Sequence, residues 1–251
     1  MKEDISKVME VCLLAGKLML ANGGETYRVE DTMLRIAQSF LEGEASSYVT
    51  PTGIFLTLQE ENQQKTKFIR IHLRSIDLNK VVLVNDISRK ISDGLMTIDE
   101  AYEKLREIEQ LNPLYPMWLK TLAAAISSGL FVLMFGGDWK DSFPAIIAGG
   151  IGFIIFVLLH DIAKVKFFAE IVTAFLIGLI VSVSTKMGFG TNLDKIIIGS
   201  IMPLVPGVLI TNAVRDLMAG DLVSGLARGA EALLTALAIG TGIAVILVFF
   251  R

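Results

Sequence analysis

The stretch from residue 196 to residue 228 constrains this chain more than any other feature. It reads IIIGSIMPLVPGVLITNAVRDLMAGDLVSGLAR, which is apolar enough to enter a bilayer, yet Pro203 and Pro206 interrupt it. Proline removes a backbone donor and clashes with the preceding turn of a helix. In lipid the freed carbonyl groups must be satisfied by protein or by a cavity. Because broken helices of this kind line transport sites, the stretch predicts one.

The residues around the break predict what such a site binds. Gly207 follows Pro206 directly and is expected to begin a half-helix, whose free backbone donors and positive dipole end attract an anionic group. Arg215 is a candidate anchor for a carboxylate. A small carboxylate-bearing molecule, such as a zwitterionic amino acid, therefore suits the site, and a proline-kinked structural helix is the alternative. The predicted substrate-binding residues are Ser200, Pro203, Pro206, Gly207, Thr211, Asn212 and Arg215.

The distribution of charge predicts two domains. Of the 251 residues, the first 112 carry 14 Lys and Arg and 18 Asp and Glu, and the remainder carries only 9 and 8. Residues 1–112 are expected to form a small soluble α+β domain, and residues 113–251 a helical transmembrane transport domain. The net charge of −3 and the lack of a basic stripe indicate no nucleic-acid partner.

The pattern of the first 112 residues predicts helix, helix, three strands, helix, helix. Asn112 and Pro113 are expected to begin the linker. The helices are expected at about 4–21, 26–41, 78–92 and 98–109, and the strands at 47–50, 54–60 and 65–73. Between the first two strands, Thr50, Thr52 and Gly53 surround a proline. They predict either a tight turn or a loop that contacts the substrate or the membrane domain.

No catalytic pattern stands out in this half. There is no nucleophile elbow, paired-histidine motif or phosphate loop, so we expect neither an enzyme nor a cofactor or metal. The single Cys12 excludes an internal disulfide and is expected to be a buried, inert thiol. Glu25, Glu30 and Asp31 lie at a helix start, where carboxylates favour the helix dipole. A membrane-anchored hydrolase or sensor acting through this half stays open as an alternative.

The second half contains five apolar runs close to the length of a membrane span. They lie at about 118–135, 143–159, 167–183, 196–214 and 230–250. The first residues lack a signal peptide, so the N-terminal domain is expected in the cytoplasm of a multi-pass protein of the plasma membrane. Outside that domain, five Lys and Arg would then lie inside and four outside, which supports this orientation only weakly.

Four carboxylates in or near the spans are candidates for proton coupling, because an ionisable residue in a bilayer is rarely idle. They are Asp216, Asp221, Glu170 and Glu231. The alternative is a capping or solvated role at the interface. Small residues at helix-packing spacing predict close contacts, either within the chain or with a second subunit. They are Gly225, Gly229, Ala236, Gly240 and Ala244.

The chain resembles the threonine/serine exporter family over nearly its whole length. The matching motifs are GSIMPLVPGVLITNAVRDLMAGDLVSGLARGAEALLTALAIGTG at 199–242, NGGETYRVEDTMLRIAQ at 22–38, TPTGIFLTL at 50–58 and LVNDISRKISDGLMTIDEAYEKLREI at 83–108. The resemblance implies secondary active export of threonine and serine, driven by the proton gradient. Long members of the family fuse this unit to a second, smaller membrane unit.

Because this chain ends at Arg251, after the fifth span, the resemblance implies a separate small membrane subunit. Assembly as a homo-oligomer is a further possibility. Related two-chain members are linked to dicarboxylate (succinate) export, which is the alternative substrate. A dianion would need a second cation beside Arg215, for which Lys164 and Lys166 are candidates.

Overall fold

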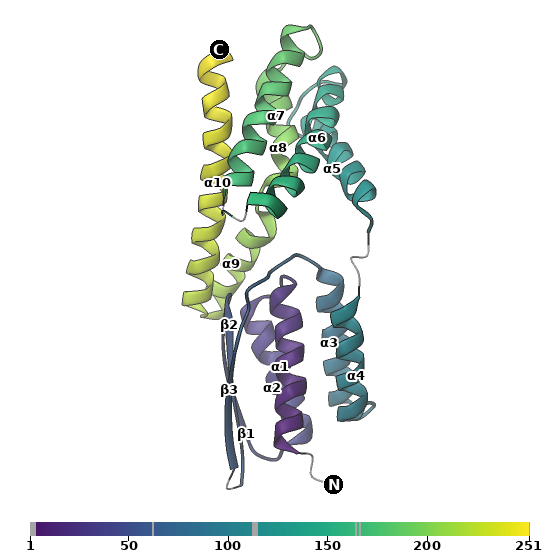
Figure 1. The fold of residues 1–251 in the computed structure, drawn as a ribbon, viewed down its shortest axis with the longest axis vertical. Coiled ribbons are helices and arrows are strands. Elements are labelled where there is room, and N and C mark those ends of the chain that lie inside the picture. Colours follow the sequence, from purple (N-terminus) through teal and green to yellow (C-terminus); the bar gives the residue numbers. More distant parts are fainter. Residues whose placement is uncertain (1–3, 62, 112–114, 164, 166, 251) are drawn as a thin grey trace. The chain divides into compact units, whose positions relative to one another are not determined.

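The structure is a computed structural model that describes residues 4–61, 63–111, 115–163, 165 and 167–250 (Figure 1). The chain forms two compact units, which are described separately below. The first unit comprises Met1–Leu114 and Val208–Gly229, and the second comprises Tyr115–Gly207 and Ala230–Arg251. A segment of the second half of the sequence therefore packs with the N-terminal residues. The expected boundary at residues 112 and 113 lies outside the described residues, and the division at that point stays a prediction.

The first unit has the predicted order of elements. It contains α1 (Ile5–Ala21), α2 (Thr26–Phe40), β1 (Glu44–Thr50), β2 (Gly53–Glu60), β3 (Gln63–Arg70), α3 (Leu78–Ser92) and α4 (Ile98–Gln110). The strands form an antiparallel sheet in the order β1-β2-β3. The third strand ends at Arg70 rather than at residue 73, because Arg70 pairs with Gly53, the first residue of β2. Residues beyond Arg70 have no partner on β2.

One face of the sheet packs against α1 and α2, which lie together on that side in Figure 1. Val49, Ile54 and Leu56 point into this core and are at most 1% exposed. Cys12 is also buried there, and its thiol donates to the carbonyl of Met33 at 3.4 Å. Burial raises the pKa of the Cys12 thiol to about 12, so the thiol is neutral near pH 7. The prediction of a buried thiol is confirmed.

The second unit is built from apolar helices. They are α5 (Met117–Met134), α6 (Trp139–Ala163), α7 (Phe168–Lys186), α8 (Leu193–Ile201), the short 3-10 helix η1 (Met202–Leu204) and the larger part of α10 (Leu222–Phe250). Among the described residues, four helices are long and apolar enough to cross a membrane. The count becomes up to five if the bent pair of Leu193–Leu204 and Gly207–Ala219 is one span.

The broken helix forms where the two prolines predict it. Helix α8 ends at Ile201, Val205 has an extended backbone, and α9 (Gly207–Ala219) begins directly after Pro206. The half-helix expected at Gly207 is confirmed. Helices α6 and α10 are longer than their apolar runs: α6 begins at Trp139 and α10 at Leu222, rather than at residues 143 and 230. Charged residues such as Asp141 and Arg228 ended the apolar runs but lie within these helices.

A buried carboxylate that the sequence did not single out holds the start of α6. Asp141 is fully buried and accepts hydrogen bonds from the backbone N–H of Thr191 at 2.6 Å and from Asn192 Nδ2 at 3.0 Å. Both donors lie in the connection between α7 and α8. Because each donor is satisfied by the same carboxylate, Asp141 fixes this connection to the start of α6.

The small residues of α10 do not all serve the same purpose. A side chain at Gly242 would collide with the backbone carbonyl of Ile171 on α7, whereas nothing lies within 4 Å of a side chain added at Gly240. Gly225 approaches Leu217 and the carbonyl of Ala213 on α9. Close packing within the chain therefore explains why glycine stands at positions 225 and 242. Contact of Gly240 with a second subunit stays a prediction.

Gly242→Ala is expected to destabilise the protein by about 1–3 kcal/mol, because the added methyl group meets backbone that cannot turn aside. The matched control is Gly240→Ala, which gains helix propensity and fills open space. The measurement is the melting temperature of both variants purified in detergent. Equal melting temperatures for the two variants would contradict the packing described for α7 and α10.

Candidate functional site

The candidate site lies in the first unit, at the N-terminal end of α2. Helix α2 follows Gly23 and Gly24, and its N-cap residue Glu25 makes no side-chain capping bond. The first free donor of the helix, the backbone N–H of Thr26, instead donates to Asp216 Oδ1 of α9 at 3.0 Å. A carboxylate 190 residues away thus supplies the cap and complements the positive end of the helix dipole.

Asp216 is completely buried and shares its surroundings with a buried arginine. Arg228, in the second turn of α10, places Nε 3.4 Å from Asp216 Oδ2 and donates from a terminal nitrogen to the carbonyl of Gly24 at 2.8 Å. Among the described residues, Asp216 Oδ2 accepts no hydrogen bond. A buried carboxylate with an unsatisfied oxygen is costly, so its charge depends on Arg228.

A second ion pair joins the same two segments. Arg215 of α9 donates to Glu25 Oε1 at 2.5 Å, and Arg28 donates to Glu25 Oε2 at 3.1 Å. The Glu25 side chain is only 6% exposed, but that of Arg215 is 55% exposed. Burial raises the pKa of Glu25, but the backbone hydrogen bond and the two arginines outweigh burial and lower it. Asn212 Nδ2 donates to the carbonyl of Gly23 at 2.8 Å.

Two further carboxylates lie beside Asp216. Thr26 Oγ1 donates to Asp221 Oδ2 at 3.5 Å, and Glu30 accepts from the backbone N–H of Val49 at 2.7 Å. Burial, together with the charge of Asp216, raises the pKa of Asp221. Burial raises the pKa of Glu30 as well, and the charges of Asp221 and Asp216 add to this effect. Both groups therefore hold a proton more readily than an ordinary carboxyl group.

The charged residues around Asp216 form a group that we call the α2–α9 cluster. Among the described residues, it has one positive charge fewer than negative charges. It has four carboxylates against three guanidinium groups: Glu25, Glu30, Asp216 and Asp221 against Arg28, Arg215 and Arg228. Binding of one proton would balance the charges. The carboxylates influence one another, so the proton belongs to the group rather than to a single residue.

The structure brings together four of the residues predicted from the sequence, namely Asn212, Arg215, Asp216 and Asp221. Thr211 is exposed on α9. The other candidates belong to the second unit: Ser200, Pro203, Pro206, Gly207, Glu170 and Glu231. The Ser200 hydroxyl donates to the carbonyl of Ile196 within α8. Lys164 and Lys166 lie outside the described residues.

Four residues of the cluster were not predicted as site residues, namely Glu25, Glu30, Arg28 and Arg228. Glu25 and Glu30 had only a general role at a helix start. For Arg228 a signal existed, because an arginine directly before an apolar run that enters a bilayer is expensive unless it is paired or reaches the interface. No local signal relates Glu25 or Glu30 to residues about 190 positions away.

The β1–β2 turn lies at the edge of the cluster. Thr50 pairs with Gly53 across the turn, and the Thr50 hydroxyl donates to the carbonyl of Gly53 at 3.3 Å. The tight turn expected for Thr50, Thr52 and Gly53 is confirmed. The neighbouring carbonyl of Val49 accepts from Ser224 of α10 at 3.1 Å. Contact of this turn with a substrate stays a prediction.

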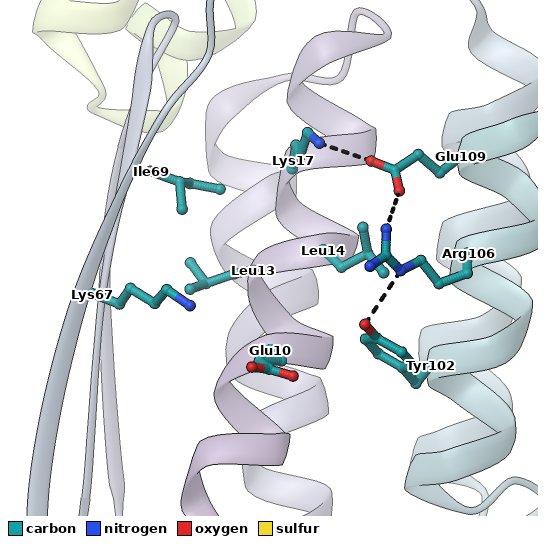
Figure 2. A pocket seen from close by; sticks show the side chains of 9 residues that line it. All are labelled: Glu10, Leu13, Leu14, Lys17, Lys67, Ile69, Tyr102, Arg106 and Glu109. Atoms are coloured by element: carbon teal, nitrogen blue, oxygen red, sulfur yellow. Dashed lines mark hydrogen bonds and ion pairs between the residues drawn. The ribbon is translucent and has the colours of Figure 1, made fainter.

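A shallow groove elsewhere in the first unit is also lined by charged residues (Figure 2). It lies between α1, β3 and α4, and Figure 2 shows contacts that join Lys17 to Glu109, Glu109 to Arg106 and Arg106 to Tyr102. Glu109 accepts from Lys17 at 2.7 Å and from Arg106 at 2.9 Å, and Arg106 also donates to the hydroxyl of Tyr102 at 3.2 Å. Exposed pairs of this kind contribute little stability, and the α2–α9 cluster is the stronger candidate because Glu25, Asp216 and Arg228 in it are buried.

Replacing Glu30 by glutamine is expected to stabilise the protein near neutral pH. The raised pKa of Glu30 means that the folded state binds the proton more tightly than the unfolded state. The protonated Glu30 therefore adds to the free energy of unfolding. This contribution is complete below the ordinary pKa of glutamate and is lost as the pH rises through the raised pKa of Glu30. Glu30→Gln should therefore melt at a higher temperature than the parent near pH 7, and the difference should vanish on acidification to about pH 4.

Melting temperatures of both proteins between about pH 4 and pH 8 test this expectation. Asp31→Asn is the matched control, because Asp31 is the next residue on α2 but is exposed and pairs with Arg35. A Glu30→Gln protein that is less stable than the parent at neutral pH, or a difference independent of pH, would contradict a raised pKa.

Comparison with known proteins identifies the family. The profile of the ThrE family, described as "Putative threonine/serine exporter", matches residues 10–250. A "Probable threonine/serine exporter" of Mycobacterium tuberculosis is 25% identical over 94% of this chain, which spans only 45% of that protein. The "Probable succinate transporter subunit YjjP" of Escherichia coli is 26% identical over 96% of this chain and 94% of its own length.

A further group of relatives is fungal. An uncharacterized protein of Schizosaccharomyces pombe, C16A10.01, is 26% identical over 94% of this chain, which covers 29% of that protein. No solved structure matches the chain. The family profile covers nearly all of the sequence, including both units and the broken helix. Its apolar helices fit a multi-pass membrane protein, and the chain belongs to the threonine/serine exporter family.

Proposed function

We propose that the chain is a secondary active exporter of threonine and serine, driven by the proton gradient through the α2–α9 cluster. The observation that supports this proposal most is the excess of one carboxylate, among the described residues, around the buried Asp216. A gradient can drive export if protonation changes which conformation is favoured. The cluster joins α9, the second helix of the broken pair, to α2, so its protonation state would affect whether α9 stays bound to α2.

The proton-binding groups are Asp221 and Glu30, because their pKa values are raised. Asp216 pairs with the buried Arg228 and lies beside the other two carboxylates. When Asp221 or Glu30 takes up a proton, repulsion among the carboxylates falls. When the proton leaves, the repulsion returns and favours separation of α9 from α2. Exchange between two such states is what alternating access requires.

The substrate-binding group in this proposal is Arg215, with the polar residues around the break. Arg215 already holds a carboxylate, that of Glu25, and more than half of its side chain is exposed. We infer that Glu25 occupies the place of the substrate carboxylate and is exchanged for it. Thr211 and Asn212, which belong to the same unit as Arg215, are the proposed partners for the rest of the substrate. The ammonium group of an amino acid would be neutralised by the released Glu25.

Export of a dicarboxylate such as succinate is the second candidate, because one relative is named as a succinate transporter subunit. Because that name calls the relative a subunit, it also supports a second subunit for this chain. We further propose that the protein lies in the plasma membrane with its N-terminal unit in the cytoplasm. An action of this unit as a hydrolase or sensor is the third candidate, and it predicts that the α2–α9 cluster is not needed.

Efflux of labelled threonine, serine and succinate from cells expressing this chain tests the proposal. The cells are compared with and without a co-expressed small membrane protein of the same family, and with and without an uncoupler. We expect threonine and serine efflux that the uncoupler abolishes. Succinate efflux alone would replace the proposed substrate. No efflux of any of the three under either condition would overturn the assignment as an exporter of these compounds.

A further inference from the structure

The outer face of the three-stranded sheet carries a row of exposed aromatic side chains. Tyr48, Phe55 and Phe68 lie directly opposite one another on β1, β2 and β3. They are 50%, 46% and 47% exposed, and the rings of Phe55 and Phe68 are 4.5 Å apart. The opposite face of the sheet already packs against α1 and α2. A contiguous exposed aromatic row of this kind marks an interaction surface.

The polarity of this face changes along the strands. The row on one side of the aromatic residues consists of Thr50, Gly53 and Arg70. The rows on the other side become polar: first Ser46, Thr57 and Thr66, and then Glu44, Gln59 and Gln64. Thr57 and Thr66 bond to each other through their hydroxyl groups. The outer face is therefore apolar and basic at one end of the sheet and hydrophilic at the other.

The apolar end of the sheet is the end next to α10. The carbonyl of Val49, adjacent to Tyr48, accepts a hydrogen bond from Ser224 in the first turn of α10. In the same turns Leu222, Val223 and Leu226 are each at least 60% exposed. Apolar surface thus continues from the start of a membrane-spanning helix toward the aromatic row.

The length of α10 places this contact near the membrane surface. Its 29 residues extend for about 43 Å at the usual rise per residue. A bilayer is about 40–45 Å thick when the headgroup layers are included. If α10 crosses the whole bilayer, its first turn lies in the headgroup layer, and Val49 and Tyr48 lie beside it. Aromatic side chains concentrate at this level, and arginine is attracted to anionic headgroups.

We propose that the outer face of the sheet docks on the membrane surface, with Tyr48, Phe55 and Phe68 in the headgroup layer and Arg70 toward the lipid phosphates. The occupant of the face is the lipid bilayer itself. The polar rows at Ser46, Glu44 and their neighbours extend away from the membrane. In this arrangement, contact with lipid keeps the sheet beside the start of α10. The proposal does not depend on which substrate the protein transports.

Depth-dependent fluorescence quenching in vesicles tests the proposal. The two natural tryptophans are first replaced, by Trp118→Phe and Trp139→Phe. Phe55→Trp or Tyr48→Trp then provides one reporter, and Gln59→Trp is the matched control, two rows or about 13 Å further along the same face. Each full-length protein is reconstituted in vesicles of phosphatidylcholine and phosphatidylglycerol, with or without lipids brominated near the headgroup.

We expect the emission of Phe55→Trp and of Tyr48→Trp to be blue-shifted and reduced about twofold or more by the brominated lipids, and that of Gln59→Trp to be almost unchanged. Red-shifted emission that aqueous iodide quenches would show the aromatic row in water. Blue-shifted emission that neither quencher affects would show that protein, such as a second copy or another subunit, covers it. Either result, or equal lipid quenching at Gln59→Trp, would overturn the proposal.

Discussion

Arg228→Met is expected to lower the free energy of unfolding by about 3–5 kcal/mol, one of the two largest effects that we anticipate. Arg228 and Asp216 are both buried, and removal of the guanidinium leaves the Asp216 carboxylate without its nearby positive charge. The carbonyl of Gly24 also loses its hydrogen bond to Arg228. The measurement is unfolding of the purified protein in detergent, followed by melting temperature or by denaturant titration.

Arg215→Met is the matched control, because it removes an arginine from the same cluster with a much smaller cost. Arg215 is half-exposed, and Glu25 keeps its second partner Arg28. We expect a loss below about 1 kcal/mol for this variant. Adding Asp216→Asn to Arg228→Met should recover part of the lost stability, since it removes the unpaired charge. Equal losses for the two arginine variants would contradict a buried, coupled pair.

The second large effect is expected on transport. Asp221→Asn should reduce export driven by a pH gradient about tenfold or more, which corresponds to ~1.4 kcal/mol of lost coupling free energy. Exchange of labelled for unlabelled substrate across the membrane should persist, because exchange requires no net movement of protons. Export driven by the gradient should fall because Asp221 has a raised pKa, and because it contacts Thr26 and the backbone of Asp216, where its proton changes the balance of charge.

The comparison of net transport with exchange distinguishes coupling from a structural role. Both rates are measured in proteoliposomes that contain the parent, Asp221→Asn or the control Asp31→Asn. Asp31→Asn should behave as the parent, because Asp31 is exposed and pairs with Arg35 on its own helix. Loss of both rates in Asp221→Asn would indicate a damaged fold, and retention of both would exclude Asp221 from proton coupling.

The sequence predicts most elements of the fold because their signals are local. The amphipathic pattern marks α1 and α2, alternation marks the three strands, and two prolines mark the break before Gly207. The predicted ends of helices and strands are less accurate where contact with residues distant in the sequence sets the end. For example, β3 ends at Arg70 because Arg70 pairs with Gly53, the first residue of β2. Helices α6 and α10 begin before their apolar runs, because the charged residues that interrupt those runs bond inside the protein: Asp141 of α6 accepts from Thr191, and Arg228 of α10 donates to Gly24.

The site was predictable only in part, because its two halves are about 190 residues apart. Charges close to an apolar run singled out Arg215, Asp216 and Asp221 without their partners. Nothing in a short window of sequence shows that Asp216 caps α2 or that Glu25 binds Arg215. These contacts arise because residues 208–229 pack with the N-terminal unit rather than with the helices beside them in the sequence.

The most direct measurement is of proton movement driven by substrate. Proteoliposomes containing the protein, with its small membrane subunit where export requires one, are loaded with a pH-sensitive dye, and threonine, serine or succinate is added outside. An exporter that exchanges substrate for protons should make the interior more alkaline as threonine or serine enters, and Asp221→Asn should abolish the signal. Uptake of labelled substrate by the parent protein with no change in internal pH would contradict proton coupling through the α2–α9 cluster.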